Sequence, residues 1–448
     1  MTGRVKKLTE GNIFKKIVLF AMPIFLGNLF QQLYNVADSL VVGNVLGKDA
    51  LAAVTSSGSL IFLIVGFLNG IFVGAGVIIS RYLGSKNYKN LSIAVHTTVA
   101  FGLITGIIIT VVGIGLSPWM LRMMGTPEDV LSNSVVYFRL YFAGGIAMSM
   151  YNACVGIFQA VGDSKHPLYY LIISAVTNVV LDILFVAFLG LGIGGAALAT
   201  TISQFLSAIL SFLKLMEVDE IYRIHIKQIQ INPGMLLSIL KLGIPTGVQN
   251  SVIGFANVIV QSNINKFGSV AMAGCGSYSK LEGFAFLPIT SFSVALTTFI
   301  SQNLGAKEYD RVKKGARFGI FTGVFLAEAV GVLLWVFAPA LIRIFNNQPD
   351  VIGFGVMQTR TEALFYCLLS LSHCLAGILR GAGKSTVPMM TMLICWCAIR
   401  ITYISIMVNV IPDIRVVFWA YPLTWFLSSV IFVIYYKKVN WMTENVAV

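Results

Sequence analysis

Charge is what this sequence has least of. Only 11% of its 448 residues are Asp, Glu, Lys or Arg, whereas 57% are hydrophobic, and the mean hydropathy is +0.85. A soluble protein needs roughly a quarter of its residues charged to cover its surface. The composition therefore excludes a soluble globular protein and predicts an integral membrane protein.

Reactive and metal-binding residues are also scarce. The chain has 4 His and 6 Cys, and the cysteines all fall within apolar runs without CxxC or Cys/His metal spacing, so we expect them to be small buried hydrophobes. HExxH and GxSxG are absent, which argues against an enzyme. The string "GAGKST" lacks the first glycine of a phosphate loop, because Ile378 occupies that position. We expect no cofactor and no use of ATP.

Long apolar runs fill most of the chain, and twelve of them reach the roughly 20 residues that cross a bilayer. The first run follows five Lys and Arg residues, but it exceeds signal-peptide length and no small-x-small cleavage site closes it, so we expect an uncleaved span. The predicted spans are 17–43, 51–79, 91–116, 134–160, 167–190, 194–214, 236–262, 270–300, 316–339, 356–379, 387–411 and 416–436.

The positive charges are distributed unevenly between the two sides of these spans. Most of the 31 Lys and Arg residues fall in the loops on the same side as the N-terminus. The positive-inside rule then predicts a multi-pass protein of the cell membrane with both termini cytoplasmic. This bias explains the net charge of +13, so no nucleic-acid partner is expected.

An internal repeat organises the chain. "SRYLGSKNY" from Ser80 matches "SQNLGAKEY" from Ser301, and "GIFQAVGDSKHP" from Gly156 matches "GILRGAGKSTVP" from Gly377, both at an offset of 221 residues. Each half holds six spans, an even number, so both halves enter the membrane from the same side. We therefore predict an all-α integral membrane protein with twelve transmembrane helices in two six-helix lobes related as parallel repeats. Secondary transporters built in this way bind substrate between the halves, near the midplane, and rock the halves against each other.

The lobe boundaries follow from the composition between the sixth and seventh spans. A polar and charged stretch with the string "EVDE" separates the two apolar halves. We expect an N-lobe over 1–216, a cytoplasmic linker over 217–235 and a C-lobe over 236–448.

The first span contains an unexpected carboxylate, Asp38, in "QQLYNVADSL". The matching residue of the second half is Val260, so packing alone does not require an acid there. An ionised side chain at mid-membrane costs about 2.5 to 3.5 kcal/mol on insertion scales and usually faces an aqueous path or a partner. Tyr34 lies one turn earlier on the same helical face, and Gln31 and Asn35 lie close to that face.

The fifth and sixth spans supply further polar groups. Asn178 and Asp182 are four residues apart in an apolar run, and Thr200 adds a hydroxyl. Together with Asp38 they would form an oxygen-rich site for a hard cation such as Na⁺, or a pair of acids that shares one proton. Either arrangement would couple transport to an ion gradient. The alternative is that the two acids are unrelated and each is bonded to neighbouring helices.

The second half carries its own unusual charges. Glu282 in span eight and Arg400 in span eleven have no charged counterpart in the first half. A cross-helix ion pair would satisfy both, and Glu282 is also a candidate substrate or proton group with Arg400 as its partner. Glu328 in span nine and His373 in span ten are left without an assigned role.

These patterns together resemble the multidrug and toxic compound extrusion (MATE) family, over nearly the whole chain. The resemblance rests on "PIFLGNLFQQLYNVADSLVVGNVLG", the two repeated loops, the span endings "QAVGDSK" and "RGAGKS", and "SKLEGFAFLP". It implies a secondary active transporter that exports organic, often cationic, compounds in exchange for Na⁺ or H⁺ through a V-shaped cavity between two lobes.

The resemblance also implies roles for particular residues. Asp38 matches the first-span acid of the family, and Asn178, Asp182 and Thr200 match the N-lobe cation site of one branch. Span ten shows no mid-span carboxylate, only His373 and Cys374, so the pattern is closer to that branch than to the one that relies on C-lobe acids. We expect the substrate cavity to be lined by Tyr34, Gln31, Asn35, Glu282, Arg400 and Asn257.

Drugs or other small organic cations and membrane lipid are the expected partners, and a monomer is expected. The first alternative is a flippase or exporter for a lipid-linked precursor or a specific metabolite, which would need more Arg and Lys in the spans to hold a pyrophosphate. The second is an intramembrane enzyme, for which no catalytic motif is present.

Overall fold

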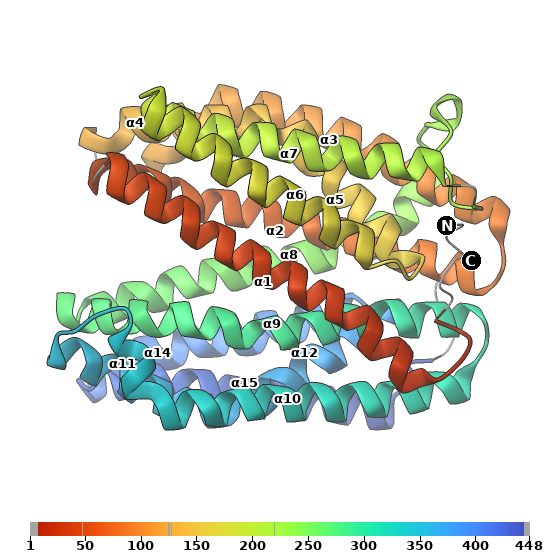
Figure 1. Ribbon diagram of the computed structural model, residues 1–448. Coiled ribbons are helices and arrows are strands. Elements are labelled where there is room, and N and C mark those ends of the chain that lie inside the picture. Colours follow the sequence, from red (N-terminus) through yellow and green to blue (C-terminus); the bar gives the residue numbers. More distant parts are fainter. Residues whose placement is uncertain (1–7, 47, 124–125, 127, 219, 443–448) are drawn as a thin grey trace. The chain divides into compact units, whose positions relative to one another are not determined.

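The computed structural model describes residues 8–442 apart from 47, 124–125, 127 and 219. Within helices, the side chains of residues 37–44, 48–60 and 129 are also outside the description. The described part of the chain is helical throughout, with no strand (Figure 1).

The first half consists of seven α-helices and one π-helical segment. A continuous apolar run can cross a bilayer only if its backbone groups are bonded within the segment, which an α-helix achieves. The elements are α1 (Ile13–Leu46), α2 (Lys48–Gly84), α3 (Tyr88–Met123), α4 (Glu128–Ala143), α5 (Gly145–Ala160), α6 (Lys165–Asp182), the π-helix Ile183–Phe188 and α7 (Gly192–Glu217).

The second half repeats this order after a linker that contains the 3₁₀ turn Ile226–Gln228. Its elements are α8 (Pro233–Asn265), α9 (Ser269–Gly305), α10 (Tyr309–Arg343), α11 (Pro349–Glu362), the 3₁₀ turn Ala363–Phe365, α12 (Tyr366–Gly381), α13 (Thr386–Met392), the π-helix Leu393–Ile399, α14 (Arg400–Val410) and α15 (Arg415–Lys438).

The helices confirm the predicted membrane fold. Ten described helices are long and apolar enough to cross a membrane, and the pair of α4 and α5, bent by 48°, supplies an eleventh. Helix α8 takes the place of the seventh predicted span; polar residues such as Gln249 and Gln261 lower its hydropathy. The twelve-helix, two-lobe architecture predicted from the repeat is therefore observed.

The chain forms two compact units, which are described separately here. The N-unit comprises residues 26–243, and the C-unit comprises 8–25 and 244–448. The divisions fall inside α1 and α8, so the beginning of each of these helices packs with the other half of the sequence. The two divisions lie two residues or fewer from Pro23 and Pro245, which are at matching positions of the repeat.

Close packing explains why the start of α8 belongs to the N-unit. Glycines permit helices to approach until their backbones touch. A Cβ atom added to Gly74 of α2 would lie 2.4 Å from the backbone nitrogen of Gly243 in α8. In the C-unit, the start of α1 contributes Ile17, Phe20 and Ala21 to a buried cluster that includes residues of α9.

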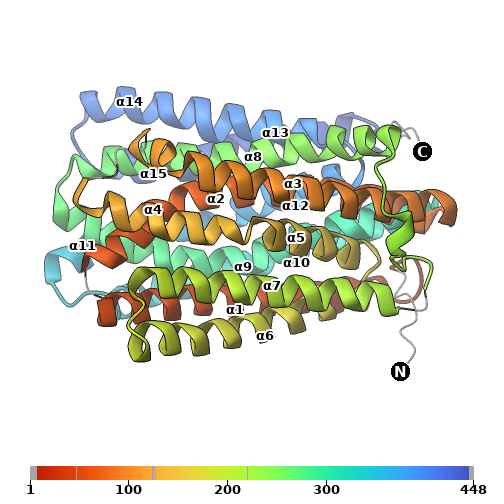
Figure 2. The same ribbon diagram turned by 90° about the horizontal axis from the view of Figure 1, so that it is seen from above.

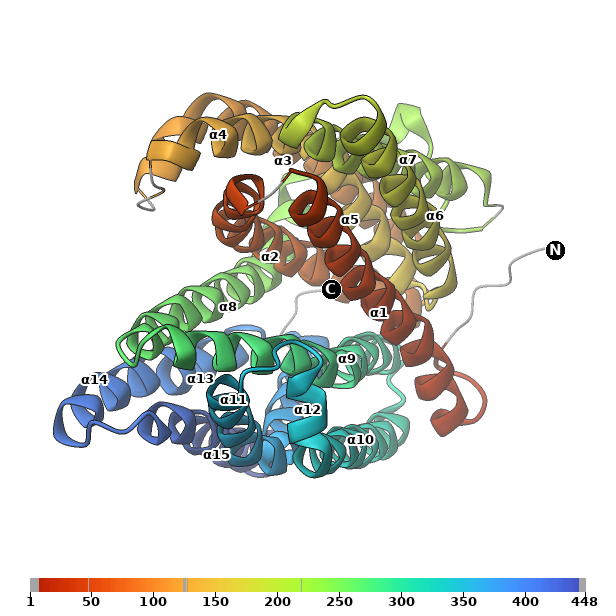
Figure 3. The same ribbon diagram turned by 60° about the vertical axis from the view of Figure 1, so that its left-hand side comes forward.

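Within each unit the helices run side by side along most of their length. In the N-unit, α6 packs against α7 and α3 packs against α5 (Figure 2). In the C-unit, α9 packs against α10, α11 and α12, as the end-on view shows (Figure 3).

The matched spans five and eleven each contain a π-helical segment. In span five it begins directly after Asp182, and in span eleven it ends directly before Arg400. Such segments leave the regular hydrogen-bond ladder and are frequent at functional sites. Each unit thus places a buried charged residue of its own at the edge of a π-helix.

Candidate functional site

Asn178 and Asp182 lie on α6 and Thr200 lies on α7, all within the N-unit. All three are buried, and the Asp182 side chain is fully enclosed. The Asn178 amide Nδ2 donates to Thr200 Oγ1 at 3.3 Å, and Thr200 Oγ1 donates to the carbonyl of Ala196 at 3.1 Å. Helices α6 and α7 therefore bring an amide and a hydroxyl together, and the Asp182 carboxylate is one helical turn further along α6.

Helix α1 runs beside α6 in the N-unit (Figure 1). A Cβ added to Gly27 would lie 3.6 Å from Leu171 Cδ2, which fixes the register of the two helices. They are the first and fifth of six alternating spans and so run in the same direction. Position 38 is 11 residues beyond Gly27, as Asp182 is beyond Leu171, a rise of about 16 Å in each helix. The predicted grouping of Asp38 with Asp182 lies outside the described residues.

The other predicted residues of α1 occupy its more accessible part. Tyr34 is half-buried, whereas Gln31 and Asn35 are exposed. Asn257, the C-unit counterpart of Asn35, is exposed on α8. Val260, which stands where the first half has Asp38, is buried in an apolar cluster of the C-unit. An apolar side chain therefore satisfies packing at this position, which leaves the acid of the first half to be explained by function.

Arg400 is the principal buried cation of the C-unit. Its Nε and Nη2 donate to Thr424 Oγ1 at 3.1 and 2.7 Å. The guanidinium carbon lies 4.3 Å from the centre of the Tyr421 ring and 5.6 Å from that of Trp396. These two cation–π contacts and the hydroxyl compensate part of the cost of burying the charge.

The expected ion pair between Glu282 and Arg400 is not formed. Among the described residues there are four ion pairs, and neither Glu282 nor Arg400 takes part in any of them. Glu282 is half-buried on α9. A hydroxyl and two aromatic rings contact the guanidinium instead, and residue types alone do not reveal that alternative.

A buried acid in span ten, Glu362, was missed by the sequence reasoning. Its side chain is 0% exposed. Tyr278 donates to Glu362 Oε2 at 3.0 Å, Gln358 donates to Oε1 at 2.8 Å, and the hydroxyls of Tyr278 and Tyr366 are 2.9 Å apart. Both carboxylate oxygens therefore accept hydrogen bonds inside the C-unit.

The expectation that span ten lacks a mid-span carboxylate is thus corrected. The membrane-spanning segment runs from Pro349 to Gly381, longer than the predicted 356–379, and Glu362 lies well inside it. It ends α11, and the 3₁₀ turn Ala363–Phe365 separates it from α12. The acid is visible in the string "QTRTEALFY". The predicted span began too late, at residue 356, so Glu362 was taken to lie near the membrane boundary.

Glu328 has a structural partner. Its Oε2 accepts a hydrogen bond of 3.0 Å from the backbone N–H of Cys367, at the start of α12. The break before α12 leaves such N–H groups without helical partners, and Glu328 satisfies one of them. His373 packs its ring against Phe286 and Trp396. All six cysteines are free; five of them are buried as predicted, whereas Cys367 is half-buried.

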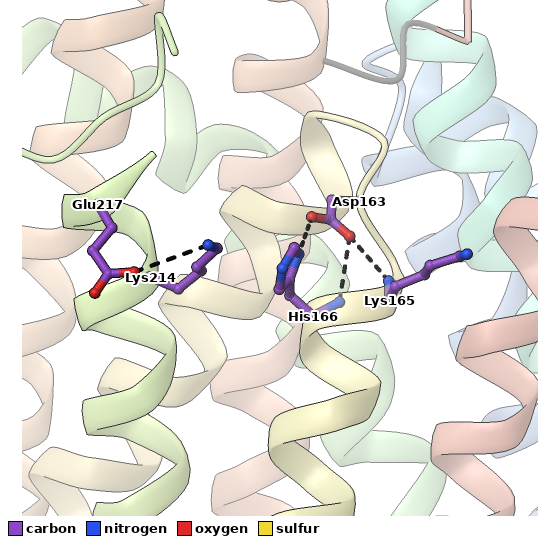
Figure 4. A network of polar contacts seen from close by, with 5 residues as sticks. All are labelled: Asp163, Lys165, His166, Lys214 and Glu217. Carbon is purple, nitrogen blue, oxygen red and sulfur yellow. Dashed lines mark hydrogen bonds and ion pairs between the residues drawn. The ribbon is translucent and has the colours of Figure 1, made fainter. Parts of the chain in front are cut away.

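A second polar network lies at the start of α6, outside the spans (Figure 4). Asp163 accepts hydrogen bonds from the backbone N–H of Lys165 and from the ring and backbone N–H of His166. Burial favours a higher pKa for Asp163, but the bonds and charge of His166 outweigh it and hold the pKa below its ordinary value. Lys214 and Glu217 form an ion pair of 3.9 Å at the end of α7.

The donor set bears on which ions the N-unit can hold. The described residues contain no group of three or more His, Cys, Asp or Glu side chains suited to a metal. Asp182, Asn178 and Thr200 instead offer oxygen atoms, which suit hard cations such as Na⁺. A proton requires only the carboxylate.

The protein consists of two repeated units of membrane-spanning helices, with a buried charged residue in each, Asp182 in the N-unit and Arg400 in the C-unit. This arrangement is typical of secondary transporters with internal repeats. The MatE family model matches residues 23–184 and matches again over 245–406, so the two matches are offset by 222 residues, within one residue of the offset of the repeated motifs. The chain therefore belongs to the MatE family, the MATE transporters.

Curated relatives and solved structures agree with this assignment. The chain is 30% identical over 400 residues to the probable multidrug resistance protein YpnP of Bacillus subtilis, with 89% of each chain covered. It is also 30% identical over 397 residues to the probable multidrug resistance protein YoeA of the same organism, covering 86% of this chain and 84% of YoeA.

Among solved structures, the fold matches a MOP superfamily transporter from Pyrococcus furiosus. The TM-score is 0.90 at 22% identity, with 97% of each chain covered. For that protein, reversed polarity of the binding pocket has been taken to suggest a different function. At this level of identity the match supports the fold alone.

Proposed function

We propose that this protein is a secondary active multidrug efflux transporter, which exports organic, often cationic, compounds by antiport with Na⁺ or H⁺. The observation that carries the proposal is the enclosed Asp182 at the edge of a π-helix, one helical turn after Asn178, whose amide donates to Thr200. A buried acid of this kind in a membrane helix is expensive and typically functional. The named function of the relatives YpnP and YoeA supports multidrug export.

In the proposed mechanism the coupling ion binds at Asp38 and Asp182, with Asn178 and Thr200 as further oxygen ligands if the ion is Na⁺. Drug and ion must favour different states, or compete for one state, because a ligand without differential affinity shifts no equilibrium. Rocking of the two lobes then gives alternating access. The candidate substrate-contacting residues are Tyr34, Gln31, Asn35, Glu282, Arg400 and Asn257, and Glu362 joins them as a second candidate acid.

The test is efflux of a fluorescent organic cation from proteoliposomes, with an imposed Na⁺ gradient and an imposed pH gradient applied separately. One gradient should drive efflux in the wild type and fail in Asp182→Asn. The matched control is Asp350→Asn, which changes an exposed acid in the first turn of α11. Equal gradient-driven rates in wild type and Asp182→Asn would rule the proposal out.

A second candidate is export of an anionic lipid-linked precursor or metabolite. It is favoured by the buried Arg380, which takes part in none of the ion pairs of the described residues. Arg380 Nη2 donates only to the hydroxyl of Ser293, at 2.9 Å. If neither gradient moves the organic cation, gradient-driven transport of a labelled anionic compound becomes the discriminating measurement.

A further inference from the structure

The linker that follows α7 forms a concave, positively charged surface. A cavity of about 350 Å³ is lined by side chains from the end of α7 and from residues 223–228. Arg223, His225 and Lys227 supply its polar wall, and Ile224 and Ile226 contribute apolar surface.

The backbone bonds of this segment give the surface a defined shape. The N–H of Ile224 donates to the carbonyl of Leu215 at 2.9 Å, which ties the linker back to α7. The N–H of His225 donates to Nε2 of His96 on α3 at 3.0 Å. Tyr222 and Ile224 are buried beneath, so the basic side chains between and after them point outward.

The basic side chains of the cavity are not neutralised by acids in the described residues. Arg223 and Lys227 take part in none of the ion pairs there, and Glu217, an acid at the end of α7, pairs with Lys214. Glu220 meets Arg223 through its backbone carbonyl, which accepts the Arg223 N–H at 2.9 Å. The cavity therefore complements an anion.

The position of the cavity indicates where that anion comes from. Helix α7 is a membrane-spanning helix that ends at Glu217, and the cavity begins at its last turn, which places it at the level of lipid headgroups. Ile221 is 38% exposed and Ile226 is 62% exposed beside the charges. Exposed aliphatic side chains next to Arg and Lys fit a boundary between acyl chains and phosphate groups.

We propose that this cavity binds the phosphate group of an anionic phospholipid, with Arg223 and Lys227 on the phosphate and Ile226 against the acyl region. The inference does not depend on the transported substrate or on the coupling ion. It assigns a lipid to the linker that joins the two halves of the sequence.

The test measures binding of phosphatidylglycerol to the purified full-length protein in detergent by native mass spectrometry, with phosphatidylcholine as the neutral lipid. The double variant Arg223→Gln/Lys227→Gln should weaken phosphatidylglycerol binding about 30-fold, which corresponds to about 1 kcal/mol for each basic side chain. The matched control is Lys313→Gln/Lys314→Gln, which removes two exposed charges of α10 outside the cavity and should retain wild-type binding.

Three results would overturn the inference. An equal loss of phosphatidylglycerol binding in both double variants would show that the lipid is attracted to basic surface in general. Unchanged binding in Arg223→Gln/Lys227→Gln would show that the lipid site lies elsewhere. Inorganic phosphate that competes at the same concentration as phosphatidylglycerol would identify a soluble anion as the occupant. If the double variant does not elute as folded protein, Lys227→Gln alone carries the test, with an expected loss of about 5-fold.

Discussion

Replacing Tyr278 with phenylalanine removes one oxygen atom from the interior of the C-unit and leaves its packing unchanged. That oxygen donates to Glu362 at 3.0 Å and lies 2.9 Å from the hydroxyl of Tyr366. A typical hydrogen bond contributes about 0.5 to 1.5 kcal/mol, and a buried polar group that loses its partner adds a desolvation cost of about 1 to 3 kcal/mol. Because Glu362 is fully buried, we expect Tyr278→Phe to lower the free energy of unfolding by about 2 to 3 kcal/mol.

A double-mutant cycle separates this bond from other effects of the substitution. The cycle compares Tyr278→Phe, Glu362→Gln and the double variant by reversible unfolding in mixed micelles. A coupling free energy of about 1 to 2 kcal/mol is expected. Tyr403→Phe is the control, since the Tyr403 hydroxyl makes no hydrogen bond to the described residues, and it should be close to neutral. A Tyr278→Phe protein as stable as wild type would refute the reasoning.

Three further substitutions test local contacts through the free energy of unfolding or the apparent melting temperature. Gly74→Ala should cost about 1 to 3 kcal/mol, because its new Cβ would lie 2.4 Å from the Gly243 nitrogen. Glu328→Ala should cost about 1 to 2 kcal/mol, because it removes the acceptor of the Cys367 N–H. Asp163→Asn should lower stability at neutral pH, since the native pKa of Asp163 lies below its unfolded value of about 3.9, and the deficit should shrink as the pH falls below about 4.

Each of these three substitutions has a control variant or an outcome that would contradict the expected loss of stability. Gly276→Ala places its Cβ in open space and should not destabilise the protein, so a similar loss for Gly74→Ala and Gly276→Ala would exclude the backbone contact as the cause. Glu328→Gln keeps an acceptor and should be nearly neutral. A deficit in Asp163→Asn that is independent of pH would show that the carboxylate charge does not contribute.

The fold could be predicted from the sequence because its two signals are strong and independent. Apolar runs long enough to cross a bilayer must be helical there, and motif matches at a single offset reveal the repeat. The grouping of Asn178 with Asp182 was also accessible, since residues four apart share a helical face. The hydrogen bond from Asn178 to Thr200 is now observed.

The remaining features depend on contacts that the residue pattern does not encode. Span ten runs from Pro349 to Gly381 with a break after Glu362, and a hydropathy reading that started the span at residue 356 misplaced this acid. Arg400 was expected to pair with Glu282, but Thr424 and two aromatic rings surround it. The exchange of helix starts between the units also follows from close contacts such as Gly74 with Gly243.

The central claim, that the buried carboxylate Asp182 couples export to an ion gradient, is tested most directly by comparing two activities of one variant. Proteoliposomes with Asp182→Asn would be assayed for gradient-driven efflux of a fluorescent organic cation and for gradient-free exchange of the same compound. We predict that gradient-driven efflux falls at least about 10-fold, equivalent to about 1.4 kcal/mol of lost coupling, while exchange is retained. Gradient-driven efflux at the wild-type rate in Asp182→Asn would contradict the account.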